Sequence, residues 1–116
     1  MNDRELLEMA AKAVGIPRQF WDYEFCRSIG HMVTPSMMWN PLESNNAALR
    51  LAVKLHISIG FIWDGENDQY DPVTAHRGSA YADEQIGITI KDEFDEEAAT
   101  RRAIVRAAAE IGKAMP

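Results

Sequence analysis

The stretch "WNPLESNNAALRLAVKL", Trp39–Leu55, joins a proline corner to an apolar helix. Pro41 disfavours helical backbone at Asn40, and Ser44 is a good N-cap residue, so a helix is predicted from Ser44 to about Leu55. Apolar residues cover most of the circumference of this helix, which is typical of burial against a sheet or other helices. The corner is therefore interpreted as the joint that seats a core helix. We expect Trp39→Ala to cost roughly 3–5 kcal/mol, as for other large core aromatics.

Alternating apolar residues after this helix predict strands. Ile57, Ile59 and Phe61 alternate with smaller or polar residues, which is the period-two pattern of a half-buried strand. Asp64-Gly65 then opens a turn and a polar loop. The predicted strands are His56–Trp63, a return strand Val73–His76 and a further strand Gln85–Ile90, with an irregular piece at Ala82–Glu84.

Helices are also predicted near both ends of the sequence. The first begins at an Asn2 or Asp3 cap and ends at Gly15. The second begins near Asp95, and its apolar residues recur at helical spacing as Ile104, Ala108, Ile111 and Met115. Its charged residues are expected to form ion pairs between positions four residues apart, Glu97 with Arg101 and Arg106 with Glu110. The pattern predicts one α+β domain over residues 1–116, a layered α-β-α sandwich with a small, mainly antiparallel sheet covered by three helices.

The segment Arg18–Met38 is the least regular part of the sequence. In "QFWDYEF" aromatic and acidic residues alternate, which suits either a short strand or an aromatic loop, and "IGHMV" (29–33) suits another short strand. Aromatic residues and methionines are enriched at protein interfaces. The residues predicted here to bind a partner are Phe20, Trp21, Tyr23, Phe25, Met37 and Met38.

Composition excludes several classes of protein. The chain has 116 residues, 47% of them hydrophobic, which suits one packed core. Its net charge of −6 argues against nonspecific nucleic-acid binding. Cys26 is the only cysteine and cannot form an intramolecular disulfide. Without a signal-peptide pattern or a stretch of about 20 apolar residues, a cytoplasmic protein with no membrane partner is expected.

The residue patterns of catalytic, metal and phosphate sites do not match this sequence. The loop that starts at Asp64 resembles a calcium loop in its first acidic residues, but Gln69 and Ala75 stand where glycine and glutamate are required. Cys26 and the three histidines lie in no catalytic or metal-ligand spacing. The glycines form no phosphate-binding loop. We therefore predict no catalytic, cofactor-binding or metal-binding residue, and an enzyme is the less favoured reading.

Three segments in order resemble a known family. They are "NDRELLEMAAKAVGI" (2–16), "WNPLESNNAALRLAVKL" (39–55) and "EEAATRRAIVRAAAEIGKAM" (96–115). Together they resemble the phage ABA sandwich domain family of small phage and prophage proteins. The resemblance implies an α-β-α layered sandwich and an accessory protein without an assigned activity, so no catalytic residue is carried over.

Three functional hypotheses remain, the third being a structural role in the virion. The first is a phage or prophage accessory protein that binds a host or phage protein, acting on it without chemistry of its own. The second is a small-ligand or nucleotide-binding protein, or a cryptic enzyme, with a pocket between sheet and helices near His31, His56 or Trp63. The sequence leaves the oligomeric state open, a homo-oligomer included.

Overall fold

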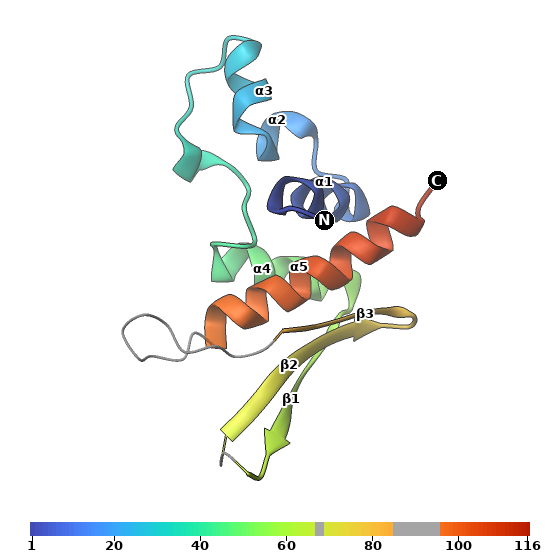
Figure 1. Cartoon of the computed structure of the whole chain (residues 1–116). Coiled ribbons are helices and arrows are strands. Elements are labelled where there is room, and N and C mark those ends of the chain that lie inside the picture. The colour runs from blue at the N-terminus through green and yellow to red at the C-terminus, as the bar shows by residue number, and fades with distance from the viewer. Residues whose placement is uncertain (67–68, 85–95) are drawn as a thin grey trace.

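A computed structural model of the chain describes residues 1–66, 69–84 and 96–116, which form five α-helices, one short 3₁₀ helix and three strands (Figure 1). These elements are α1 (Asp3–Val14), α2 (Arg18–Trp21), α3 (Tyr23–Ser28), η1 (Pro35–Met37), α4 (Asn45–Leu55), β1 (Ser58–Asp64), β2 (Gln69–Arg77), β3 (Ala80–Glu84) and α5 (Glu96–Ala114). The predicted α+β class, with an antiparallel sheet packed against helices, is confirmed.

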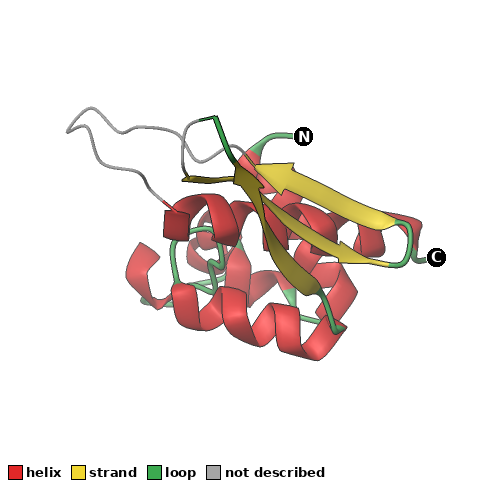
Figure 2. Ribbon diagram, turned by 90° about the horizontal axis from the view of Figure 1, so that it is seen from below, coloured by secondary structure: helices red, strands yellow, loops and turns green. Residues whose placement is uncertain are grey.

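The described helices lie on one face of the described sheet (Figures 1 and 2). Helix α5 occupies the middle of the domain, where it contacts β2 and β3 on one side and α1 and α4 on the other. A helix enclosed in this way needs small residues around its circumference. Accordingly Ala103, Ala107, Ala108 and Ala109 of α5 are completely buried. The layers therefore run from helix to helix to sheet.

The three strands form an antiparallel sheet in the order β1-β2-β3. Ile59, Ala75 and Ala82 are paired across the three strands and face the helices. The neighbouring pair, His76 and Tyr81, lies on the opposite face and is exposed. Each strand therefore presents one face to the helices, as the period-two pattern predicts.

The predicted helix ends are confirmed wherever the structure describes them. The Asn2 side chain accepts a hydrogen bond from the Glu5 amide at 2.8 Å and caps α1. Gly15 ends that helix with φ of 75°, a left-handed conformation that glycine adopts without strain. The Ser44 hydroxyl accepts from the Ala47 amide at 3.2 Å and caps α4. Asp95, the predicted cap of α5, lies outside the described residues.

The corner before α4 has the predicted role of a joint. The Asn40 side chain accepts a hydrogen bond from the Leu42 amide at 3.1 Å, and Pro41 is fully buried. Trp39 and Leu42 are partly buried and pack against the hydrophobic core. Because Trp39 keeps part of its surface in water, Trp39→Ala should cost less than the 3–5 kcal/mol expected for a fully buried aromatic.

Several strand and burial predictions are wrong. Residues 19–25 form neither the short strand nor the aromatic loop considered for them, because Asp22 ends α2 and caps α3, so the chain is helical on both sides of it. Residues 29–33, which follow the end of α3, contain no strand. The piece predicted as irregular is strand β3, which pairs with β2 beyond the tight turn at Gly78. Leu49 and Val53 of α4 are 59% and 64% exposed, so this helix buries only one side. The strand predicted at Gln85–Ile90 lies outside the described residues.

The arginines of α5 bind distant residues and not the predicted partners on their own helix. Arg106 pairs with Glu84 of β3 at 2.8 Å, and Arg102 pairs with Asp3 of α1 at 2.9 Å. Arg101 donates to the Leu42 carbonyl at 2.8 Å. Neither predicted pair is found among the ion pairs of the described residues, and the arginines instead tie α5 to its neighbours.

Candidate functional site: an exposed apolar lobe

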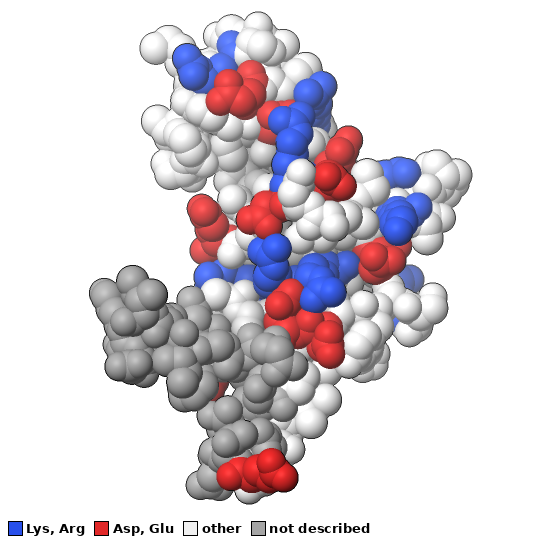
Figure 3. Space-filling view, viewed as in Figure 1, with Lys and Arg blue, Asp and Glu red and all other residues white. Residues whose placement is uncertain are grey.

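Residues 17–38, called the lobe below, contain α2, α3 and η1 and project from the rest of the domain beside α1 (Figure 1). Figure 3 shows the lobe at the top, where residues other than Lys, Arg, Asp and Glu cover much of the surface between a few charged side chains. This is the segment in which the sequence predicted a partner-binding surface.

Asp22 fixes the lobe to α1. Its carboxylate accepts hydrogen bonds from Arg4 of α1 at 2.9 Å and from Arg18 of α2 at 3.0 Å. The same side chain accepts from the Phe25 amide at 3.2 Å and so caps α3. Burial would raise the pKa of Asp22, but the hydrogen bonds from Arg18 and Phe25 and the charges of Arg4 and Arg18 together hold it below its ordinary value. The carboxylate is therefore ionised at neutral pH.

Three aromatic rings of the lobe are covered by arginines. The guanidinium carbon of Arg18 lies 4.4 Å from the centre of the Phe25 ring. Arg27 lies 5.7 Å from the Tyr23 ring in the same way, and Arg4 lies 6.0 Å from Trp21. Such cation–π contacts contribute about 0.5–1 kcal/mol each at exposed sites. Trp21, Tyr23 and Phe25 are half-buried, so they serve mainly to hold the lobe together.

Four apolar side chains of the lobe are exposed: Met32 by 98%, Met37 by 66%, Phe20 by 56% and Ile29 by 48%. Of the six residues predicted to bind a partner, Phe20 and Met37 belong to this group. The other four, Trp21, Tyr23, Phe25 and Met38, are half-buried.

Sequence reasoning missed Ile29 and Met32 as site residues. Both fall in the segment interpreted as a strand, where one face would have been buried. In the structure Ile29 follows the end of α3, and Met32 lies in the loop beyond it, where it lines a shallow hollow with Arg27, His31, Val33 and Thr34.

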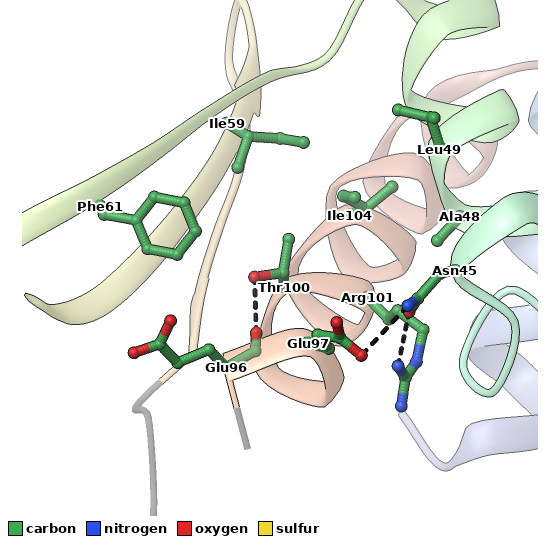
Figure 4. Close-up of a pocket in the computed structure, with 10 residues that line it drawn as sticks. All are labelled: Asn45, Ala48, Leu49, Ile59, Phe61, Glu96, Glu97, Thr100, Arg101 and Ile104. Carbon is green, nitrogen blue, oxygen red and sulfur yellow. Dashed lines mark hydrogen bonds between the residues drawn. The ribbon is translucent and has the colours of Figure 1, made fainter. Parts of the chain in front are cut away.

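A second feature is an apolar groove between α4, β1 and the first half of α5 (Figure 4). Ile59 and Phe61 of β1 form one wall, Ala48 and Leu49 of α4 form the other, and Ile104 lies at its base. Its volume is about 260 Å³, and it is open along the surface. The remaining lining residues are polar: Asn45, Glu96, Glu97, Thr100 and Arg101.

The three histidines lie on separate elements, whereas Cys26 belongs to the same lobe as His31, whose backbone amide donates to the Cys26 carbonyl at 3.2 Å. His31 is in the lobe, His56 ends α4, and His76 is on the exposed face of β2. Cys26 is buried within α3. No three His, Cys, Asp or Glu side chains of the described residues are grouped closely enough to hold a metal ion. The acidic loop from Asp64 is described only in part, since residues 67–68 lie outside the structure's description.

No protein-family model, curated protein or solved structure matches this chain. Within the described part of the chain, no helix is both long enough and apolar enough to cross a membrane.

Proposed function

We propose that the protein is a phage or prophage accessory protein that binds a host or phage protein through the lobe, with no catalytic step of its own. The exposure of Met32, Met37, Phe20 and Ile29 within one projecting segment carries this proposal. Methionine and aromatic side chains adapt to a partner's shape and supply much of the apolar contact at interfaces. The phage origin rests on the resemblance of the three sequence segments.

The anchoring of the lobe also favours binding. Asp22 and the arginine-covered rings keep the backbone of α2 and α3 in place without using the four exposed apolar side chains. Phe20 on α2 and Ile29 at the end of α3 are thereby held in place before a partner binds, so they lose less conformational entropy on binding. In this proposal the protein acts in the cytoplasm of the host cell, where its single cysteine stays reduced.

Paired substitutions test the lobe directly. Phe20→Asp together with Met32→Asp should reduce recovery of a specific partner from host lysate at least ~10-fold, because a charge in an apolar interface is left without compensation. Met115→Asp, at a methionine that is 40% exposed outside the lobe, is the matched control and should leave recovery unchanged. Thermal unfolding of each variant shows whether it is folded. Equal recovery of the same protein by folded lobe variants and wild type would refute the proposal.

The alternative of a small-ligand or nucleotide-binding protein has the groove of Figure 4 in its favour, since it lies between the sheet and the helices. None of His31, His56 or Trp63 lines it. Because the groove is open, a small molecule in it would stay largely in water, whereas ligand pockets bury most of the ligand. We expect no shift of the melting temperature with nucleotides, metal ions or common metabolites. A saturable shift would favour the alternative, since binding at a hundredfold excess over Kd stabilises by about 2.7 kcal/mol.

A further inference from the structure

We propose that the groove between β1, α4 and α5 binds a basic amphipathic helix of a partner protein. This surface is separate from the lobe: it lies beside β1 and the first turns of α5, whereas the lobe projects on the far side of α1 (Figures 1 and 4). Binding at this groove therefore goes beyond the proposed function and is tested independently of it.

Three of the apolar side chains that wall the groove are partly exposed. Leu49 is 59% exposed, Phe61 46% and Ile59 39%. Val53, one helical turn after Leu49 on α4, is 64% exposed and extends the apolar surface along that helix. Grooves with such walls accept the apolar face of a helix, whose side chains recur at i, i+3 or i+4, and i+7.

The charges at one end of the groove indicate the sign of the charge that a partner would carry. Glu96 and Glu97 begin α5 there, and both residues are exposed. Arg101, the basic residue of the lining, is held away from β1 because it donates to the Leu42 carbonyl at 2.8 Å and to the Asn45 side chain at 2.7 Å (Figure 4). A lysine or arginine at the end of a bound helix would meet these carboxylates.

The net charge of the chain supports the same partner over a second copy of this protein. Because each copy of the chain carries a net charge of −6, two copies repel each other, whereas a basic segment is attracted to the chain. The occupant that fits both the walls and the charge is thus a helix with one apolar face and basic residues near one end.

A pair of synthetic peptides tests this inference. One is a 14-residue amphipathic helix with leucines on one face and lysines at one end, and the other carries glutamates in place of the lysines. At low salt the lysine peptide should bind the full chain at least ~10-fold more tightly than the glutamate peptide, and the ratio should fall as salt screens the charges. Titration calorimetry measures the affinities, and amide chemical shifts locate the site.

Single substitutions test separately how the apolar walls and the charged end of the groove contribute to binding. Leu49→Asp should weaken binding of the lysine peptide at least ~10-fold, since it places a charge in the apolar wall. Glu96→Gln should reduce the preference for the lysine peptide ~3-fold, while Glu110→Gln, at an exposed carboxylate outside the groove, should not change it. Met32→Asp in the lobe should have no effect, so this result is distinguishable from failure of the proposed function.

Three outcomes would overturn the inference. The first is equal affinity for both peptides, and the second is binding that Leu49→Asp leaves intact. The third is a concentration-dependent dimer, seen by sedimentation, that Leu49→Asp dissociates. That last result would assign the groove to a second copy of the chain.

Discussion

Replacing Gly112 by alanine is expected to destabilise the protein by about 3 kcal/mol, at the upper end of the range for overpacked cores. A Cβ at this position would collide with the backbone carbonyl oxygen of Met9 on α1, and it would lie 2.8 Å from the carbonyl carbon of Met9 and 3.3 Å from the Ala13 amide nitrogen. These are backbone atoms of a packed helix, so the contact is relieved only if α1 and α5 move apart. That movement would open the contact in which Ala10 and Ala108 are completely buried.

The sign of the change in stability distinguishes a packing effect from an effect of helix propensity. In an exposed helix, glycine to alanine stabilises by about 1 kcal/mol, which is the opposite sign. Urea denaturation of Gly112→Ala measures the free energy of unfolding, and the melting temperature should fall by about 12 °C. Lys113→Ala, at the neighbouring exposed residue, is the control and should stay within about 0.5 kcal/mol of wild type. A Gly112→Ala protein as stable as wild type would show that the two helices are not in backbone contact.

The second large effect is expected for Asp22→Ala, which should cost about 2–3 kcal/mol. The substitution removes the α3 cap, which contributes about 1 kcal/mol, and the charged hydrogen bonds to Arg4 and Arg18. The cost is moderated because those two side chains are more than half exposed and regain water. Asp22→Asn keeps an oxygen that can cap α3, so it should lose less stability than Asp22→Ala. Urea denaturation gives both values, and hydrogen exchange should show faster exchange in α2 and α3.

The pH dependence of Asp22 has a definite sign. Its pKa is lowered in the folded protein, so its stabilising contribution is complete above the ordinary aspartate pKa of about 3.9 and is lost as the pH falls through the folded value. The stability difference between wild type and Asp22→Asn should therefore be full at pH 6 and shrink below pH of about 4. A difference that stays constant down to pH 2 would show that the ionised carboxylate does not contribute.

Local signals predicted much of the fold correctly. The caps at Asn2 and Ser44 and the left-handed glycine at Gly15 each depend on a few adjacent residues, so sequence alone identifies them. The alternation through Ile59 likewise marks β1. Features that depend on long-range contacts were not predictable. The arginines of α5 have acidic neighbours on their own helix, and only the tertiary fold shows that Asp3 and Glu84 are their partners.

The candidate site was predicted in part for the same reason. Aromatic and methionine residues marked the lobe, but their exposure depends on which of them pack beneath the arginines. Alternation around Asp22 suggested a short strand or an aromatic loop, whereas the buried carboxylate makes that residue a junction between two helices. Met32 lies in the segment 29–33, which was interpreted as a short strand, and was not included among the predicted binding residues, although it is the most exposed of the large apolar residues described. Leu49 is the opposite case: it was predicted to be buried but is exposed, because the sequence does not show which side of α4 faces the groove.

Site-specific photo-crosslinking in host lysate tests the central claim, that the lobe is the binding surface, most directly. A photoreactive amino acid at position 32 should give one discrete crosslinked protein, and the same group at position 115 should not give it. The adduct should disappear when Phe20→Asp is added to the same chain. Identical adducts from positions 32 and 115, or an adduct from position 115 alone, would contradict the account.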